Sequence, residues 1–584
     1  MSRTALIVIV LLGAVAGFAI YATNHLPQPS DEVVATAPAP PTGPRCIAAG
    51  QQGSSVPATA AKWAQGAQMF DGLGSFSRKV TTSSEEAQKY FDQGMRYLWA
   101  FNHDESSRSF AKAAELDPNC AMCWWGLALT VGPNYNLPMM AAPRAKVAFE
   151  AVQFAQKSSD HAQPVEQALI AALGKRYPNV QPLDPSNEGP ILTAYAQAMK
   201  DVAQKYPDDL DVQTLYAESM MNINAWKLWT LDGKPAPGTD EIVATLESVL
   251  KKDVQHPGAN HYYIHALEAS PHPEKAIASA ERLRGMMPAA GHLEHMPAHI
   301  MQRVGRYEDA AIANRKGAAA DLAYFGKTKP LDYYAMYTGH NYQFLAFSAA
   351  MEGRKAETLE AARQSRATIP DEMLLAQPGF DWIIGNVYFA KLRFGLWDEM
   401  LAEAPPNVKL PGLSGAYLYG KAVALAAKGK LDDARATIAQ LDKLAADTPA
   451  DYGAGFNSAR DMFAIASRIA KARVAEAESK SDDAIALLRD AVAKEDQTAY
   501  DEPADWFFPV RHLLGAELLK AGKAADAEVV YREDLQRHPA NGWALFGLKQ
   551  SLEAQKKSAE AAKVDAQFQQ AWKQADVQLT ASML

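Results

Sequence analysis

From residue 87 onward, apolar and polar positions follow one another with the period of amphipathic helices. Alanine is abundant, and runs of β-branched residues are scarce outside the extreme N-terminus, so the composition favours helix as well. The pattern therefore predicts an all-α protein. At 584 residues the chain is long for one globular core, but an array of stacked helix pairs has no such limit.

One 34-residue unit shows the arrangement most clearly. Residues at positions 8, 11, 24, 27 and 32 of this unit are Gly94, Tyr97, Phe110, Ala113 and Pro118. A small residue lets the two helices approach closely, apolar residues fill the seam to the next unit, and a proline ends the second helix. This spacing resembles a tetratricopeptide repeat. The resemblance implies a right-handed superhelix (an α-α solenoid) whose concave groove binds a peptide, a partner protein or a small ligand.

Further copies of the unit follow along the chain. The clearest later copy covers residues 508–539 and has these residues in register: Leu514, Gly515, Leu518, Ala527, Tyr531 and Pro539. Weaker copies are anchored on a small residue at position 20: Ala276, Ala310, Ala434 and Ala484. We expect roughly ten or eleven units. Residues 74–138 also resemble a largely uncharacterised group of exported bacterial repeat proteins, with "FNHDE", "CAMCWWG" and "GPNYNLPM" in the same order.

The N-terminal segment predicts export. Residues 4–22 form a run of 19 residues without a charge, long enough to cross a bilayer as a single transmembrane or signal helix. Arg3 precedes the run and two acidic residues follow at 31 and 32, which places the N-terminus in the cytoplasm and the repeats in the periplasm. The protein is then anchored to the inner membrane, or soluble in the periplasm if the chain is cleaved after Ala22.

The remaining chain divides by composition. We assign residues 1–25 to the anchor or signal and 26–73 to a disordered tether rich in proline and alanine. Residues 74–180, 190–400 and 401–584 form N-terminal, central and C-terminal groups of repeats. The net charge of −9 is spread along the chain with no basic block, which excludes nucleic acid as an expected partner.

Seven of the 13 histidines lie between residues 256 and 299. In the repeat register, His261 and His295 fall at position 5, and His265 and His299 at position 9. His292 and His340 fall at position 2. The resemblance implies that positions 2, 5 and 9 of the first helix face the groove, so these six histidines should converge there.

Two imidazoles four residues apart on a helix can bind one metal ion, and a neighbouring helix can supply a third ligand. The six histidines therefore predict a site for a transition metal such as zinc, copper or iron, with Glu218 and Glu268 as candidate oxygen ligands or hydrogen-bond partners. The alternative is that the imidazoles bond only to a peptide or to one another. Pro297 lies within this segment and could start the helix late or kink it, which would turn His295 off the common face.

Two other groups of residues are candidates for a ligand-binding or redox role. Asn222 and Trp226 precede the histidines and, with Asn134 and Asn136 of "GPNYNLPM", are candidates for the wall or rim of a ligand groove. Cys120 and Cys123 lie at the start of a helix, as a structural disulfide or as a redox pair.

The sequence contains no nucleotide-binding loop, no "GxSxG" and no "HExxH", so enzyme chemistry would rest on the histidines alone. The leading interpretation is a membrane-tethered periplasmic scaffold that binds its ligand in a repeat groove and holds a metal ion there. The alternative is an exported metalloenzyme in which the histidines leave one coordination position open.

Overall fold

The computed structural model describes residues 56–140, 142–184, 187–328 and 334–583. The predicted membrane helix at residues 4–22 and most of the predicted tether lie outside these residues. Among the described residues, none of the helices combines the length and the apolar character that crossing a bilayer requires. The chain separates into two compact units, residues 53–345 and residues 346–584, whose boundary falls within helix α16.

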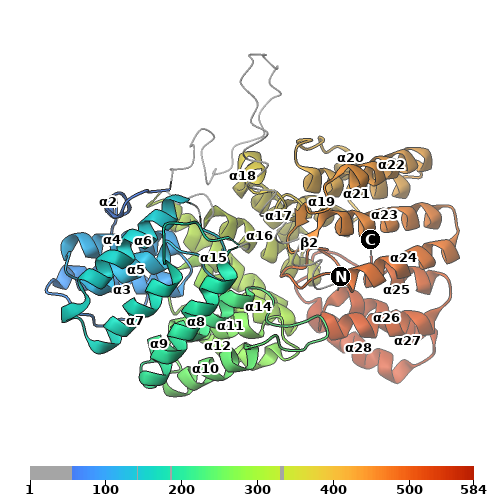
Figure 1. Ribbon diagram of the computed structural model, residues 1–584. Helices are drawn as coiled ribbons and strands as arrows, with labels where there is room; N and C mark the ends of the chain where they lie inside the picture. The colour runs from blue at the N-terminus through green and yellow to red at the C-terminus, as the bar shows by residue number, and fades with distance from the viewer. Residues whose placement is uncertain (1–55, 141, 185–186, 329–333, 584) are drawn as a thin grey trace, which may run out of the picture. The chain divides into compact units, whose positions relative to one another are not determined.

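The described part of both units is almost entirely helical, as the pattern predicts (Figure 1). The first unit contains α2 (Ala60–Ala64), α3 (Glu85–Trp99), α4 (His103–Leu116), α5 (Ala121–Thr130), α6 (Ala142–Lys157), α7 (Pro164–Arg176), α8 (Glu188–Lys205), α9 (Leu210–Met221), α10 (Thr239–Lys252), α11 (Pro257–Leu267), α12 (Ile277–Leu283), α13 (Gly291–His295), α14 (Pro297–Arg303), α15 (Tyr307–Phe325) and the start of α16 (Tyr334–Met351).

The second unit continues from α16 with α17 (Lys355–Thr368), α18 (Asp371–Ala376), α19 (Asn386–Arg393), α20 (Trp397–Leu401), α21 (Pro411–Ala427), α22 (Leu431–Asp447), α23 (Ala459–Ala477), α24 (Ser481–Glu495), α25 (Val510–Lys520), α26 (Ala524–Arg537), α27 (Gly542–Ala554) and α28 (Ser558–Ala571). Two strands of two residues each, β1 (Gly453–Ala454) and β2 (Asn457–Ser458), form an antiparallel pair before α23.

Successive helices pack as pairs, and each pair packs on the next, which confirms a tetratricopeptide-type fold. The predicted seam residues act as expected. A methyl group added at Gly94 would lie 2.7 Å from the ring of Phe110, and one added at Gly126, on the following helix, 2.4 Å from the same ring. One aromatic ring therefore fills the space between two glycines on neighbouring helices, and α4 ends two residues before Pro118.

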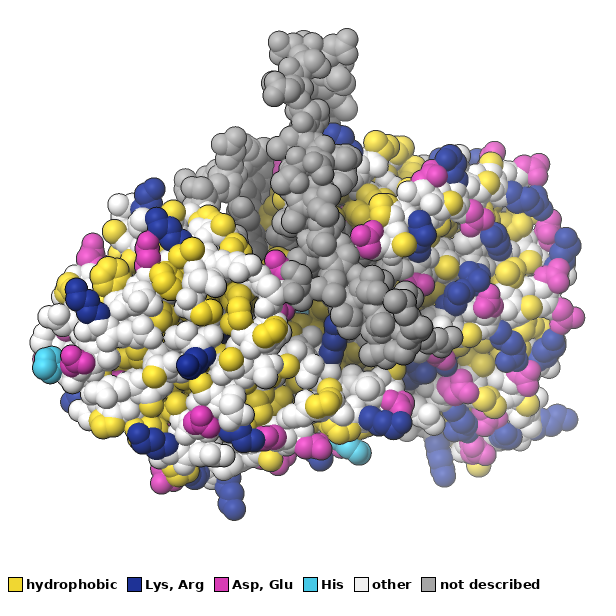
Figure 2. All heavy atoms as spheres, viewed as in Figure 1, with side chains coloured by type: hydrophobic (Ala, Val, Ile, Leu, Met, Phe, Trp, Pro, Cys, Tyr) yellow, Lys and Arg dark blue, Asp and Glu magenta, His cyan; other side chains and the backbone are white. Residues whose placement is uncertain are grey.

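The second unit repeats this arrangement. The ring of Tyr531, at the same repeat position as Phe110, fits between Gly515 and Gly547, where added methyl groups would lie 2.3 and 2.2 Å from it. On the face drawn in Figure 2, acidic and basic side chains are interspersed and histidine is scarce. The histidines between residues 256 and 299 are instead buried, except for His272.

Candidate metal centre

Helix α11 carries His261 and His265 on one face. Pro257 occupies its first turn, where no intrahelical N–H is lost, and His256 caps the start by accepting a hydrogen bond from the amide of Ala259. The other ring nitrogen of His256 bonds to Asp211 at 3.0 Å, so this histidine has a structural role. His261 and His265 are four residues apart on this helix, so they lie one turn apart, with ring centroids 4.9 Å from each other.

The expected disruption at Pro297 does not occur. Helix α13 starts at Gly291, Met296 keeps a right-handed helical conformation with φ −50° and ψ −36°, and Pro297 begins α14. The backbone therefore keeps a helical conformation where α13 ends and α14 begins. His295 stays on the same face as His299, and their Nε2 atoms are 2.9 Å apart. The prediction that His295 would turn away is wrong, because a proline in the first turn costs no hydrogen bond there.

The six predicted histidines form two groups of three. His261, His265 and His292 offer ring nitrogens that all lie within 4.8 Å of one another, and we call them the first triad. His295, His299 and His340 satisfy the same criterion and form the second triad. The two triads adjoin, since the rings of His292 and His295 are centred 5.8 Å apart and those of His265 and His299 5.9 Å apart.

Hydrogen bonds to oxygen fix the orientation of three of these rings through Nδ1, and a carboxylate oxygen lies near Nδ1 of a fourth. His261 bonds to the carbonyl of Trp99 at 2.6 Å, and His295 to Oδ1 of Asn314 at 2.7 Å. Glu268 serves two rings: its Oε1 lies 2.9 Å from His265 and its Oε2 3.1 Å from His299. An oxygen acceptor at Nδ1 places the proton there, so Nε2 keeps its lone pair and points into the cluster.

The first triad contains buried nitrogens that nothing satisfies. Within the described part of the chain, no hydrogen-bond partner reaches Nε2 of His261, Nε2 of His265 or either ring nitrogen of His292. These three side chains are 0–1% exposed. A buried polar atom without a partner costs about 1–3 kcal/mol, so three such rings in contact favour a ligand that accepts their lone pairs.

Burial keeps these imidazoles neutral. It lowers the pKa of His261 to about 3 and that of His340 to about 4. Burial, reinforced by the neighbouring imidazoles, also holds the pKa of His265, His292 and His299 well below the ordinary value. Neutral imidazole is the form that coordinates metal ions, so the surroundings keep the rings ready to bind.

Aromatic rings enclose the triads. The ring centroid of Phe101 is 4.5–5.7 Å from those of the three rings of the first triad. The ring centroids of Tyr135 and Trp226 are 5.1 and 5.8 Å from that of His265. The ring centroids of Tyr337 and His292 are 4.6 Å apart, and that of Phe344 is 5.0–5.5 Å from the three ring centroids of the second triad. Such a wall excludes water and lowers the local dielectric constant.

Two residues of this wall have unusual backbone conformations. Phe101 has φ of +53° and Trp226 has φ of +61°, and they are the non-glycine residues with positive φ among the described residues of the first unit. A bulky side chain in this region is strained, and such strain persists where the surrounding structure requires it. Both strained residues contact the histidines, which supports a functional role for the cluster.

The triads are not exposed on an open groove, as the repeat register alone suggested. Of the six histidines, five are 0–2% exposed and His340 is half-buried. The turn between α3 and α4 covers the first triad with Trp99 and Phe101, and the loop after α5 adds Tyr135. The chain itself therefore occupies the space in which a peptide would lie.

The other candidates for the site lie beside the triads or outside them. Glu218 accepts a hydrogen bond from Asn222 at 2.6 Å and lies beside the buried Arg176, and it belongs to none of the groups with metal-ligand spacing. Asn134 caps its own turn by accepting from the amides of residues 136 and 137 at 2.9 Å. Asn136 instead lies beside Tyr337, so the loop at its tip is close to the wall of the first triad.

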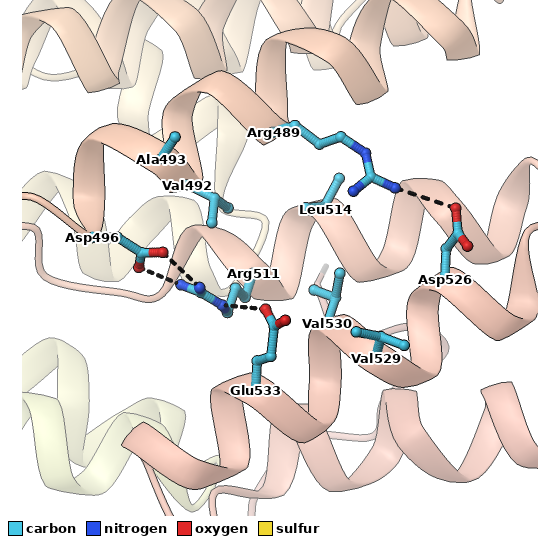
Figure 3. A pocket seen from close by; sticks show the side chains of 10 residues that line it. All are labelled: Arg489, Val492, Ala493, Asp496, Arg511, Leu514, Asp526, Val529, Val530 and Glu533. Atoms are coloured by element: carbon cyan, nitrogen blue, oxygen red, sulfur yellow. Dashed lines mark hydrogen bonds and ion pairs between the residues drawn. The ribbon is translucent and has the colours of Figure 1, made fainter.

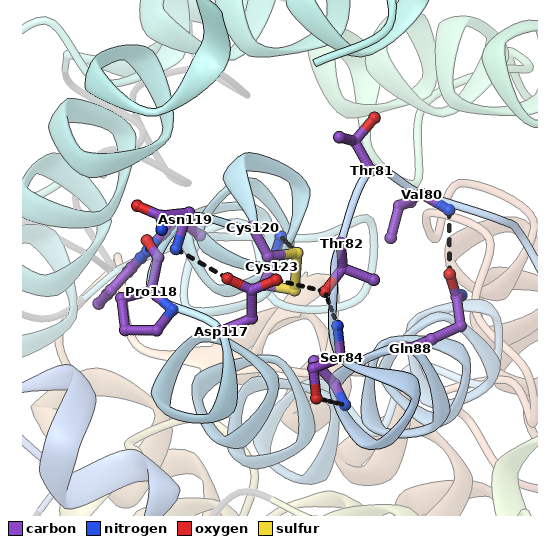
Figure 4. Close-up of a disulfide and its surroundings, with 12 residues drawn as sticks. Val80, Thr81, Thr82, Ser84, Gln88, Asp117, Pro118, Asn119, Cys120 and Cys123 are labelled. Carbon is purple, nitrogen blue, oxygen red and sulfur yellow. Dashed lines mark hydrogen bonds between the residues drawn. A yellow bond between two sulfur atoms is a disulfide. The ribbon is translucent and has the colours of Figure 1, made fainter. Parts of the chain in front are cut away.

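Cys120 and Cys123 form a disulfide at the start of α5, where Cys120 is the N-cap (Figure 4). Both side chains are fully buried. The adjacent turn is held by Asp117, which accepts from the hydroxyl of Thr82 at 2.6 Å and from the amide of Asn119 at 3.1 Å. This setting favours the structural disulfide over the redox pair, because a buried sulfur is inaccessible to a partner thiol.

The second unit contains a pocket of about 340 Å³ between α24, α25 and α26 (Figure 3). Its charged residues already pair with one another. Arg511 bonds to both oxygens of Asp496 at 2.7 and 2.8 Å, and Arg489 pairs with Asp526 at 3.2 Å. The arginines thus have carboxylate partners within the pocket, and the histidine triads remain the better candidate site.

Comparisons with known proteins do not assign this chain to a family. No family model matches the chain, and no curated protein matches it in sequence. Among solved structures, the human IFIT1 dimer with m7Gppp-AAAA is 12% identical with a TM-score of 0.32, covering 78% of this chain and 90% of that chain. Yeast Tom70 is 13% identical with a TM-score of 0.27, covering 83% and 91%. At these values the similarity carries no inference, and the fold assignment rests on the helix pairs themselves.

Proposed function

We propose that this chain is an exported helix-repeat scaffold that binds a transition-metal ion in its buried histidine cluster. The observation that carries the proposal is the first triad. Three imidazoles there bring ring nitrogens within 4.8 Å of one another, and no partner within the described residues reaches Nε2 of His261 or His265 or either nitrogen of His292. A metal ion is the ligand that three converging, neutral imidazoles fit best.

Burial separates this proposal from peptide binding at the same residues. A peptide in a repeat groove contacts exposed side chains, whereas the first triad is 0–1% exposed and is covered by Phe101 and Tyr135. A single ion needs little space and replaces the missing hydrogen bonds of the rings. Protein or peptide partners, which repeat arrays commonly bind, would then contact other surfaces of the helix pairs.

A second candidate function is an exported metalloenzyme. It is favoured by the number of ligands, because each of the two triads supplies three imidazoles. Structural zinc sites usually have four protein ligands, whereas catalytic sites have three and leave a position for water or substrate. Imidazole ligands suit zinc, copper, iron and nickel, so the donor set alone does not select among them.

Location outside the cytoplasm forms part of the proposal. The uncharged run at residues 4–22 has the length of a membrane-spanning helix. The disulfide between Cys120 and Cys123 supports export, since such bonds persist in oxidising compartments such as the bacterial periplasm. The repeats would then stand on the periplasmic face of the inner membrane, tethered by the N-terminal segment.

Metal analysis of protein purified without an affinity tag tests the function. We expect bound transition metal in the wild type, and loss of that metal in a His265→Ala/His299→Ala variant, which removes one ligand from each triad. When free metal exceeds its Kd about 1,000-fold, added Zn²⁺ should stabilise the wild type by about 4 kcal/mol, seen as a raised Tm. A His161→Ala/His272→Ala variant is the matched control, because neither histidine belongs to a group with metal-ligand spacing. Wild type that holds no metal and melts identically with and without Zn²⁺, Cu²⁺ or Fe²⁺ would exclude the function.

A further inference from the structure

We infer that the cluster holds two metal ions, one in each triad, with Glu268 as the positioning residue that the two sites share; this inference rests on the proposed metal binding. The six imidazoles divide by distance into two sets whose ligand atoms each lie within 4.8 Å. A tetrahedral ion takes four ligands, so one such ion cannot use all six rings. Two ions with three imidazoles each account for every histidine of the cluster.

The hydrogen bonds of the second triad carry the argument for its own ion. The side-chain amide of Asn314 donates to the carbonyl of Ala310, which leaves Oδ1 to face Nδ1 of His295. That oxygen can only accept, so His295 carries its proton on Nδ1. A carboxylate oxygen of Glu268, which is also an acceptor, lies 3.1 Å from Nδ1 of His299 and favours a proton there. With their protons on Nδ1, both rings present the lone pair of Nε2.

These two lone pairs face each other. Nε2 of His295 and Nε2 of His299 are 2.9 Å apart, a distance that normally requires a proton between them. In the tautomer with both protons at Nδ1, the contact brings two acceptors together and is repulsive. A cation placed near both nitrogens converts it into an attraction, and the ring of His340, centred 4.9 Å from that of His295, supplies the third ligand.

Glu268 links the two sites through their outer hydrogen bonds. One oxygen accepts from His265 of the first triad, and the other lies 3.1 Å from Nδ1 of His299 in the second. The side chain is 1% exposed, and a buried carboxylate is costly unless positive charge compensates it. Two cations behind the two imidazoles provide that charge, and the carboxylate in turn makes both rings better ligands. Three protein ligands on each ion leave positions for water or hydroxide.

Stoichiometry tests this inference directly. Metal-free wild type, titrated with Co²⁺ and followed by visible absorption and by metal analysis after gel filtration, should take up two ions per chain. His292→Ala should leave one ion, held by the second triad, and His340→Ala should leave one ion, held by the first. One ion per chain in the wild type overturns the second site while leaving metal binding itself intact. No bound ion overturns both. The number of ions bound by the wild type alone distinguishes these outcomes, so the test does not depend on whether the variants fold.

A Glu268→Gln variant tests the shared positioning residue. The glutamine has a similar shape but a single acceptor oxygen, so only one ring keeps its Nδ1 partner. We expect the Kd for Co²⁺ to rise 10–100-fold at one or both sites, while the Tm of the metal-free protein changes little. Glu274→Gln, at an exposed glutamate that pairs with the exposed His272, is the control. Unchanged Kd values at both sites would remove Glu268 from the proposal.

Discussion

At the scale of single residues, the histidine triads lie against a wall that contains strained residues. Phe101 follows the C-cap of α3, in the position where helices often place a glycine because φ is positive. Here a phenylalanine accepts the strain, and its fully buried ring packs on His261, His265 and His292. The structure thus retains an unfavourable backbone conformation in exchange for an apolar cover over the first triad.

A pair of substitutions at Phe101 separates the strain from the packing. Phe101→Ala and Phe101→Gly both remove the ring, at a cost of about 3–5 kcal/mol. The glycine adopts positive φ freely, so Phe101→Gly should be more stable than Phe101→Ala by about 1 kcal/mol in denaturant unfolding. The opposite order, with alanine more stable, would mean that the residue does not hold a left-handed conformation in solution.

At the scale of helices, the sequence predicts the convergence of the histidines but not their burial. The repeat register places His261, His265, His295 and His299 correctly because side chains four residues apart share a helix face. Their cover could not be predicted in this way. Trp99, whose carbonyl binds His261, is 162 residues away along the chain, and Asn314, which orients His295, lies on α15 with no motif to mark it. Such partners depend on tertiary packing and leave no periodic signal.

The glycines of the helix seams give a test at this scale. Gly94→Ala forces a methyl group to within 2.7 Å of the ring of Phe110, which packs tightly against a second glycine on α5. We expect a loss of about 1–3 kcal/mol in the free energy of unfolding. At Gly189, in α8, none of the described residues comes within 4 Å of the added methyl group, so Gly189→Ala should stabilise by about 0.5–1 kcal/mol. Equal effects at the two positions would contradict the seam packing.

At the scale of the whole molecule, one compact unit carries both histidine triads, and a membrane anchor is predicted at the N-terminus. The 34-residue pattern and the glycine–aromatic seam recur in both compact units, so the fold class could be predicted from sequence. The division of residues 74–584 into three groups of repeats and the handedness of the superhelix stay predictions. The six histidines of the two triads all lie in the first unit, although both units use the same repeat. The proposed function therefore depends on which side chains occupy the first helix of a pair, and not on the repeat itself.

Export is the last prediction, and it concerns the whole chain. The 19 uncharged residues at 4–22, preceded by Arg3, should insert with the N-terminus in the cytoplasm and carry the repeats across the inner membrane. Alkaline phosphatase fused after Leu584, which is active only in the periplasm, should therefore be active in a bacterial host. The same fusion lacking residues 1–25 should be expressed but inactive, because nothing would then direct the chain across the membrane. An active truncated fusion would show that residues 1–25 are not needed for export. An inactive full-length fusion at equal expression would instead place the repeats and the histidine triads in the cytoplasm, where the disulfide between Cys120 and Cys123 would be reduced.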